Sequence, residues 1–335
     1  MQREPNTEYV LSLSYGKDSL ARLGAIEELG WPLDRITHAE VWATDDIPAD
    51  LPPMVQFKAK ADEIIRERYG IEVEHQCAVR NGEKLTYEKL FYHIPVRKKK
   101  TLDRFGEGGG GISDCRVPTP PRSMVQQQTQ TPKSATGSRL RSAHGARNSK
   151  TGLILGFPII KGQWCTSDLK RRVFSRSSLA QGAGTNIVQY LGIAADEPER
   201  IKRHDKPGFK MPLVEIGWTE ADCRKWCEER DLLSPIYTTA TRGGCWFCHN
   251  QGIDQLRILR REYPDLWKLL LKWDRDSPVS FHADGHTVHD FDLRFQAEDL
   301  DLVPKDRKFR WKMLSGDTMV AVTKRNLLKL LEGSI

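Results

Sequence analysis

One stretch near the N-terminus constrains the fold of this 335-residue chain more than any other. Residues 10–13 form a short apolar run, residues 14–18 form a polar turn, and the apolar spacing that follows is typical of a helix. A turn that opens a helix presents unpaired N–H groups and the positive end of the helix dipole, which favour a phosphate. Gly16 allows close backbone approach and Lys17 adds a charge. We therefore predict a strand, a phosphate-binding turn and a helix; an ordinary charged surface turn is the alternative.

The segments that follow predict a parallel sheet. Residues 36–43 and 71–75 have the composition of strands, and the amphipathic segment between them has helical spacing. Strands that alternate with helices indicate parallel pairing with right-handed crossovers, and ligands of such sheets bind beyond the carboxyl ends of the strands. The turn at 14–18 and the acidic Asp45 and Asp46 fall at such ends. Asp45 or Asp46 could hold a ribose or a magnesium ion, or could cap the following helix.

Composition narrows the class of protein. Hydrophobic residues make up 39% of the chain, and no apolar run approaches the roughly 18 residues of a membrane helix. The N-terminus is polar and lacks a signal-peptide pattern, so we expect a cytoplasmic protein with no membrane partner. In that compartment its seven cysteines are expected to be thiols or metal ligands. The net charge of +7 favours an anionic partner such as a nucleotide or nucleic acid.

A basic, low-complexity insertion divides the chain. Residues 104–150 are rich in Gly, Pro, Gln and cations and poor in apolar residues, so we expect a flexible segment. It is either a solvated linker or an arm that contacts nucleic acid through Arg139, Arg141, Arg147 and Lys150. On either side we expect the two halves of one α/β domain, residues 1–103 and 151–253. A basic helical extension would then cover residues 254–335.

Several motifs, in order, resemble one superfamily. Ser14-Tyr15-Gly16-Lys17-Asp18-Ser19 is similar to the SGGKDS signature of the PP-loop ATP pyrophosphatases (adenine nucleotide alpha-hydrolase-like), with Tyr15 in place of the first glycine. It is not a Walker A loop, because Leu11 stands where that loop needs glycine and Asp18 where it needs Ser or Thr. Downstream elements resemble the phosphoadenylyl-sulfate (PAPS) reductase-like branch: Cys165 with Lys170, Gly192 with Glu197 and Arg200 or Arg203, residues 212–222, and Pro235-Ile236-Tyr237 with Gly244-Cys245.

The resemblance implies a fold and a set of site residues. The implied fold is α/β, a twisted parallel sheet with helices on both faces, and the implied ligand is ATP, or PAPS, with Mg²⁺. Lys17, Lys170, Arg200 and Arg203 would bind phosphate, and Asp196 or Glu197 would assist the Mg²⁺. The implied catalytic residues are Lys17, Asp18, Lys170 and Arg200. The implied nucleotide-binding residues are Ser12, Ser14, Tyr15, Gly16, Lys17, Asp18, Ser19, Asp45, Gly192, Asp196, Glu197 and Arg203.

The cysteines predict a metal site. Cys245 and Cys248 have the Cys-x-x-Cys spacing that places two thiolates on one metal. Cys165 is the third candidate, because iron–sulfur relatives place a cluster cysteine in that element, and Cys227 is the fourth, with His249 as its rival. We expect a 4Fe–4S cluster, with structural Zn²⁺ or ordinary buried thiols as alternatives.

The predicted activity follows from one departure from the reductases. Those enzymes end in a tail that bears a nucleophilic cysteine, whereas no cysteine follows Cys248 here. The chain therefore resembles the sulfur-activating proteins of DNA phosphorothioation systems and the tRNA thiolation enzymes. We expect an AMP-forming ATP pyrophosphatase that adenylates a substrate for sulfur transfer to nucleic acid (DNA or tRNA), with a cysteine desulfurase or another sulfur donor. The alternatives are a PAPS reductase and a non-catalytic nucleotide-binding module, which Tyr15 would favour.

The C-terminal part carries two weaker signals. Residues 305–312 interleave cations with aromatic residues, a pattern that suits either nucleic-acid contact or an amphipathic surface strand. His286, His289 and Asp290 could form a second metal site, but their spacing matches no known one and favours a polar turn with hydrogen-bonded histidines.

Overall fold

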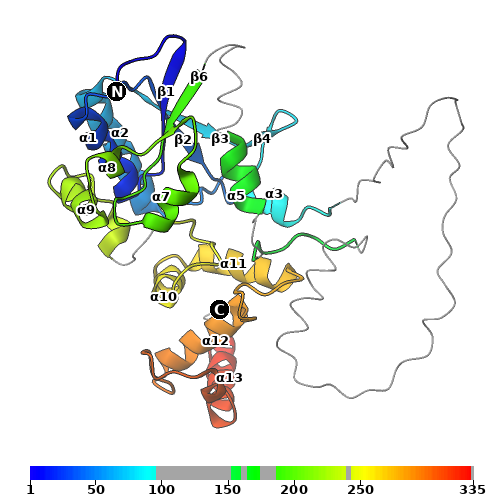
Figure 1. The fold of residues 1–335 in the computed structure, drawn as a ribbon. Coiled ribbons are helices and arrows are strands. Elements are labelled where there is room, and N and C mark those ends of the chain that lie inside the picture. Colours follow the sequence, from blue (N-terminus) through cyan, green and yellow to red (C-terminus); the bar gives the residue numbers. More distant parts are fainter. Residues whose placement is uncertain (96–151, 160–163, 174–185, 239–242, 333–335) are drawn as a thin grey trace, which may run out of the picture. The chain divides into compact units, whose positions relative to one another are not determined.

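The centre of the protein is a parallel sheet, seen in a computed structural model that describes residues 1–95, 152–159, 164–173, 186–238 and 243–332. Five strands pair in the order β3-β2-β1-β6-β7, and every pair is parallel (Figure 1). The α/β prediction is confirmed at this level. The strands are β1 (Thr7–Leu13), β2 (Arg35–Glu40), β3 (Val73–Cys77), β6 (Asn186–Tyr190) and β7 (Phe209–Lys210).

The strand order creates a switch point beside β1. The chain starts in the middle of the sheet, builds β2 and β3 on one side, and then places β6 and β7 on the other. The connections that leave β1 and β6 therefore diverge at the carboxyl edge of the sheet, which is where open parallel sheets bind ligands. The turn at 14–18 and the segment that contains Gly192 both lie in these connections.

Helices flank the sheet and bury its core. The first helix, α1, follows the turn as expected but already begins at Lys17, within the predicted turn at 14–18, and Leu20, Leu23 and Ile26 are buried with β1 and β6 in one hydrophobic cluster. The helices of this part are α1 (Lys17–Glu28), α2 (Pro52–Tyr69), α3 (Tyr87–Phe91), α5 (Trp164–Thr166), α7 (Pro198–His204), α8 (Pro212–Glu215) and α9 (Glu220–Glu228). Shorter elements are the π-helical turn η1 (Ser167–Arg171), the 3₁₀ turn η2 (Pro235–Thr238) and the hairpin of β4 (Val79–Arg80) and β5 (Glu83–Lys84).

A buried arginine in α1 ties the helix to the strand ends. The guanidinium of Arg22 donates to the carbonyls of Ser12 (2.5 Å) and Tyr190, at the ends of β1 and β6. Burial lowers its pKa to about 10, so the side chain remains a cation at neutral pH. The residue lies on the helix face that periodicity assigns to the core, and its charge gave no signal of this role.

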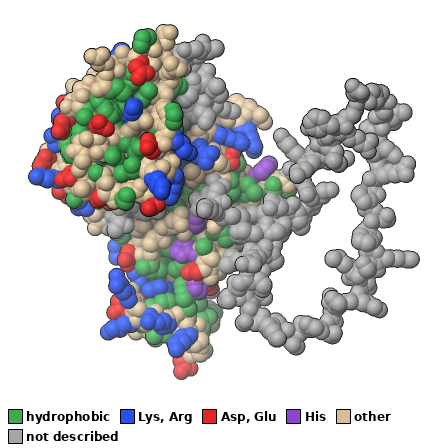
Figure 2. Space-filling view, in the orientation of Figure 1, with side chains coloured by type: hydrophobic (Ala, Val, Ile, Leu, Met, Phe, Trp, Pro, Cys, Tyr) green, Lys and Arg blue, Asp and Glu red, His purple; other side chains and the backbone are tan. Residues whose placement is uncertain are grey.

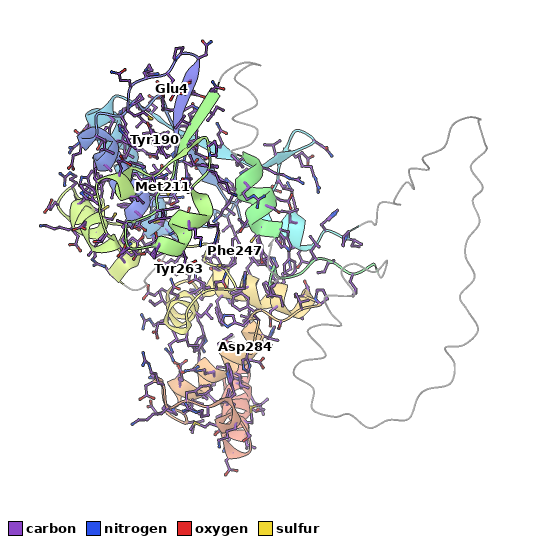
Figure 3. The ribbon with its side chains drawn as sticks, viewed as in Figure 1. Glu4, Tyr190, Met211, Phe247, Tyr263 and Asp284 are labelled. Atoms are coloured by element: carbon purple, nitrogen blue, oxygen red, sulfur yellow. The ribbon has the colours of Figure 1, made fainter. Side chains whose placement is uncertain are left out.

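Four helices form the C-terminal part, as expected for a helical extension: α10 (Ile253–Glu262), α11 (Pro264–Asp276), α12 (Val288–Asp299) and α13 (Asp317–Leu331). Aromatic rings join α3 to this part; Trp246 stacks on Trp273 of α11 at 5.6 Å, and Phe247, labelled in Figure 3, lies 4.1 Å from the ring of Tyr87. Residues 1–93 and 155–335 make up one compact unit. No helix in the described ranges is both long and apolar enough to cross a membrane.

Three expectations about elements differ from the structure. The second strand ends at Glu40 rather than at residue 43, because Trp42 turns back to form a bridge with Pro48. The third strand is shifted to Val73–Cys77. Residues 305–312 are not a strand; Phe309 is buried and the 3₁₀ turn η3 (Trp311–Met313) follows. The insertion at 104–150, with Arg139, Arg141, Arg147 and Lys150, lies outside the described residues.

Candidate functional site

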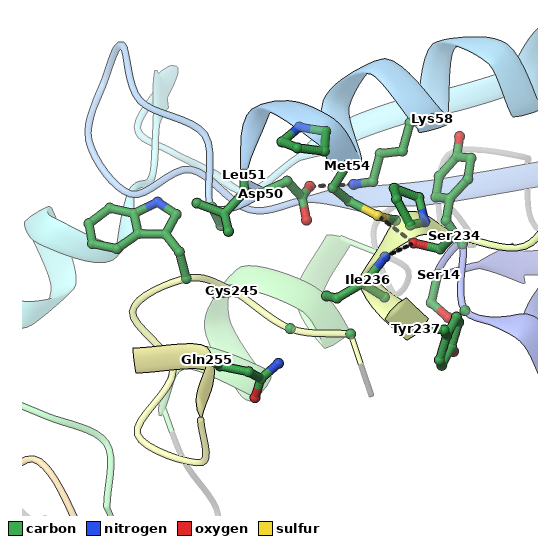
Figure 4. Close-up of a pocket in the computed structure, with 18 of the residues that line it drawn as sticks. Ser14, Asp50, Leu51, Met54, Lys58, Ser234, Ile236, Tyr237, Cys245 and Gln255 are labelled. Carbon is green, nitrogen blue, oxygen red and sulfur yellow. Dashed lines mark hydrogen bonds and ion pairs between the residues drawn. The ribbon is translucent and has the colours of Figure 1, made fainter. Parts of the chain in front are cut away.

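A cavity of about 650 Å³ opens at the carboxyl edge of the sheet. The turn at 14–18 forms one wall, and the segment from Ala49 to Lys58 at the start of α2 forms another. The remaining wall comes from Lys170 of η1, residues 234–238 around η2, residues 243–246 and α10 (Figure 4). Of the residues predicted from the sequence, Ser14, Tyr15, Gly16, Lys17, Asp18, Lys170 and Cys245 line this cavity.

The backbone of the turn is held in a defined shape. The N–H of Ser14 donates to Ser19 Oγ (2.8 Å), and the N–H of Lys17 donates to the hydroxyl of Tyr237 (3.0 Å), a residue 220 positions later. A Cβ at Gly16 would stand 3.3 Å from that same hydroxyl, so a larger residue here would crowd Tyr237. Among the described residues, the N–H groups of Gly16 and Asp18 have no partner, so they are open to an anion.

Lys17 is held at the cavity by two carboxylates. Its Nζ lies 2.6 Å from Asp18 Oδ1 and 3.1 Å from Glu220 Oε2, at the start of α9. Burial alone would lower the pKa of the ammonium, but the two carboxylates outweigh it and raise that pKa above its usual value. A bound phosphate would compete with these carboxylates for the cation. Glu220 was not predicted, because an acidic residue in the first turn of a helix is common for dipole reasons alone.

Asp18 has the opposite balance. Burial raises the pKa of its carboxyl, the Lys17 ammonium opposes that shift, and the charges of Glu220 and Glu197 add to it. Its neighbouring carboxylates and burial thus oppose ionisation of Asp18, and the Lys17 ammonium favours it. Removal of Lys17 would leave the Asp18 and Glu220 carboxylates without the cation between them, so the charges of the three side chains depend on one another.

A second polar group lines the cavity behind the turn. The Lys58 Nζ contacts Asp50 Oδ2 at 2.5 Å and His38 Nε2 at 2.8 Å, and the Nδ1 of His38 lies 2.8 Å from the carbonyl of Leu13. Burial and the nearby Lys58 charge lower the pKa of His38 to about 3. A neutral His38 donates from Nδ1 to Leu13 and accepts from Lys58 at Nε2. None of these three side chains carries a sequence motif, and none was predicted.

Tyr15 joins the turn to α2 and β3. Its hydroxyl donates to Asp62 Oδ1 (2.5 Å) and lies 3.1 Å from His75 Nε2. His75 in turn lies 2.9 Å from Asp62 Oδ2 and 2.9 Å from Glu40 Oε1. The hydrogen bonds to Asp62 and Glu40 raise the pKa of His75 to about 9, so its ring is protonated at neutral pH.

We expect His75 to make stability depend on pH. Because its pKa is raised on folding, the stabilisation is complete below the unfolded value near 6.5 and is lost as pH rises through about 9. The side chain is 30% exposed, so solvent screening limits the loss to about 1–2 kcal/mol. Urea unfolding at pH 6.5 and 9.5 measures it. His75→Gln should remove this difference, and an identical pH dependence in both proteins would contradict the assignment.

Three of the predicted metal ligands gather near Lys170. Cys245, Cys165 and Cys248 are all close enough to Lys170 to raise the pKa of its ammonium. Burial raises the pKa of the Cys245 thiol to about 12, and the nearby Lys170 charge opposes that shift. A π-helical turn carries Lys170, a local irregularity that is frequent at functional sites.

The fourth predicted ligand lies elsewhere. Cys227 is buried in the hydrophobic core, where its thiol donates to the carbonyl of Lys17 at 3.3 Å. Within the described ranges, no three His, Cys, Asp or Glu side chains are arranged to hold a metal ion. The 4Fe–4S cluster and the structural Zn²⁺ both stay predictions. His249, the rival ligand, is buried. His289 instead bonds Asp274 through Nδ1 at 2.5 Å, and His286 stacks on Trp311.

Other predicted residues do not line the cavity. Glu197 accepts from the N–H of Ala194 and pairs with Arg200, and Asp196 accepts from the N–H of Glu220. Arg203 is exposed on α7. Asp45 pairs with Lys89, and the residue that caps α2 is Leu51 rather than either aspartate. Ser12 and Ser19 bond within the protein, to Gln189 and to the N–H of Ser14.

Gly192 has a packing role in the same region. A Cβ there would stand 3.0 Å from the Arg22 side chain and 3.2 Å from the carbonyl of Asp18. Glycine therefore lets the connection after β6 lie directly against the start of α1. The nucleotide contact that the resemblance implies for Gly192 stays a prediction.

Comparison with known proteins adds one short similarity. No protein-family model matches the sequence. The chain is 26% identical over 133 residues, 39% of its length, to an uncharacterised nin region protein, ORF290, of Escherichia phage lambda. The matched stretch covers 43% of that protein, so the chain spans less than half of its relative. This similarity shows neither a family nor an activity.

Proposed function

We propose that this protein binds MgATP in the cavity and transfers its adenylyl group to an acceptor with release of pyrophosphate, AMP being released when the adenylated acceptor reacts further. One observation carries the proposal: the turn with Lys17, the η1 lysine Lys170 and the hydroxyl of Tyr237 come from distant segments and line one cavity at the switch point of the sheet. The open N–H groups at Gly16 and Asp18 support phosphate binding there.

The reaction needs few protein groups. An acceptor oxygen attacks the α-phosphorus of ATP, the bond from that phosphorus to the α,β-bridging oxygen breaks, and pyrophosphate leaves with the electron pair. Negative charge builds on the departing pyrophosphate, where Lys17 and the turn N–H groups would stabilise it. Magnesium arrives with the phosphates of ATP, as is usual for this ion. A sulfur nucleophile would then displace AMP from the adenylated acceptor.

A nucleic acid is the acceptor that the charge distribution favours. Arg307, Lys308, Lys312, Lys324 and Arg325 are exposed on the C-terminal part, and in the portion of the chain that the structure describes none of them has an ion pair. Figure 2 shows lysine and arginine side chains over this part. Such unpaired cations suit a phosphodiester backbone. The sulfur donor, such as a cysteine desulfurase, is a further part of the proposal.

Product analysis tests the reaction. ATP labelled at the α- or the γ-phosphate is incubated with the protein and Mg²⁺, with and without added DNA or tRNA. We expect one pyrophosphate for each adenylyl group transferred, with the α-label recovered on the acceptor or, after its displacement, as AMP. Turnover should be faster with the nucleic acid that is the acceptor. ADP and inorganic phosphate as products would refute the proposal. ATP binding without turnover would indicate a binding module, and sulfite release from PAPS would indicate a reductase.

A further inference from the structure

Tyr15 has a backbone conformation that favours glycine. Its φ is +56°, in the left-handed region, and its side chain is fully buried. A residue with a Cβ is disfavoured there, so the chain retains a strained residue at the centre of its phosphate-binding turn. The side chain must therefore supply something that glycine would not.

The phenol connects the turn to two other elements. Its hydroxyl bonds Asp62 on α2 and His75 on β3, while the edge of its ring meets His38 of β2 with centroids 4.8 Å apart. The Lys58 ammonium lies 5.2 Å from the ring centroid. A phenylalanine ring would fill the same space, so packing alone does not require the hydroxyl. The two hydrogen bonds of this hydroxyl, to Asp62 and His75, therefore anchor the turn to α2 and β3; we call this pair of bonds the fastening.

The titratable and charged groups around the Tyr15 hydroxyl come from each element packed against it. Asp62 and Lys58 belong to α2, His75 to β3, and His38 and Glu40 to β2. Asp50, which precedes α2, reaches Lys58. The Asp62 carboxylate accepts one hydrogen bond from the Tyr15 hydroxyl and one from His75, so both of its oxygens are occupied. This arrangement fixes where the Tyr15 hydroxyl, and with it the turn, can lie.

We propose that Tyr15 is a positioning residue: its hydroxyl, bonded to Asp62 and His75, holds the turn at 14–18 in the shape that presents Lys17 and the Gly16 and Asp18 N–H groups to the cavity. The link to nucleotide binding rests on the function proposed above. The effect on the turn itself does not, because the fastening exists without any ligand.

The test compares Tyr15→Phe with a matched control, Tyr190→Phe. Tyr190, labelled on β6 in Figure 3, is also fully buried, and its hydroxyl donates to the carbonyl of Pro32 at 2.6 Å, away from the cavity. Two quantities are measured for each protein: hydrogen exchange of the peptide that covers residues 10–20, without nucleotide, and the dissociation constant for MgATP. Turnover at saturating ATP is recorded as well.

In Tyr15→Phe we expect amide exchange in the turn to rise about 10-fold and the MgATP dissociation constant to rise about 10-fold, a cost of about 1.4 kcal/mol in binding. Turnover at saturating ATP should fall as well, because the loosened turn presents Lys17 and its N–H groups less precisely to the charge that develops on pyrophosphate. Tyr190→Phe should leave both quantities unchanged. If the turn of Tyr15→Phe exchanges its amide hydrogens at the wild-type rate, the proposal is wrong.

A second variant guards against misfolding and separates the two proposals. Asp62→Asn removes the charged acceptor without touching the turn, and adding it to Tyr15→Phe should produce no further increase in exchange, since both act on one contact. Fully additive effects would refute the fastening. If Tyr15→Phe loosens the turn while the wild-type protein binds no ATP, the proposed function fails and the positioning role stands.

Discussion

Replacing Lys17 with alanine is expected to lower pyrophosphate release at saturating ATP by about 100-fold or more. Removal of one preorganised group that stabilises developing charge typically costs a factor of about 10²–10³. Lys17 is the cation on the turn itself, with its ammonium held at the cavity by Asp18 and Glu220. The rate is measured by coupled detection of pyrophosphate under saturating MgATP.

Two further variants show whether the lower rate of Lys17→Ala comes from the loss of this cation at the cavity. Lys60→Ala removes an exposed lysine of α2 that pairs with Asp231 outside the cavity, and it should leave the rate unchanged. In Lys17→Ala the carboxylates of Asp18 and Glu220 face each other, so repulsion could account for part of the loss. Lys17→Ala combined with Glu220→Gln removes that repulsion and should remain inactive. Recovery of activity in the double variant would show that Lys17 only neutralises Glu220.

Gly24→Ala is expected to destabilise the fold by about 2–3 kcal/mol. In an exposed helix interior this change would stabilise the protein by up to about 1 kcal/mol, because alanine is the better helix former. Here a Cβ would stand 2.3 Å from Nε1 of Trp226, where α1 packs on α9, and overpacking of this kind costs roughly 1–3 kcal/mol. Urea unfolding gives the free energy.

The source of that penalty can be isolated. In a Trp226→Leu background the indole is gone, so adding Gly24→Ala should cost less than about 1 kcal/mol and can become favourable. An equal cost in both backgrounds would show that the penalty does not come from the indole. Lys17 and Asp18 are the first residues of α1, so the packing of α1 on α9 also orients these two side chains at the cavity.

Local patterns in the sequence were enough for the framework. The apolar run, the polar turn and the helical spacing after it predicted β1, the turn and α1, and the alternation of strands and helices predicted parallel pairing. These features depend on neighbours in the chain, which periodicity reports directly. The same reasoning placed Lys17 and Gly16 at the carboxyl edge of the sheet, where the cavity lies.

Contacts between distant segments were not predictable in the same way. Periodicity shows that Cys227 faces inward, but not that it meets the carbonyl of Lys17 rather than the other cysteines. It assigns Arg22 to the core face of α1 without revealing the strand-end carbonyls that accept from it. Glu220 likewise lies 203 positions after Lys17 and gives no local sign of that ion pair.

The sequence alone thus determined an α/β chain with a turn suited to phosphate after its first strand, because both depend on the order and spacing of residues along the chain. Only the tertiary structure decided which side chains share the cavity with that turn, and that Tyr15 fastens it to Asp62 and His75. The physical reason is that these hydrogen bonds and ion pairs join segments far apart in the chain, whereas a sequence pattern reports only the spacing of neighbouring residues.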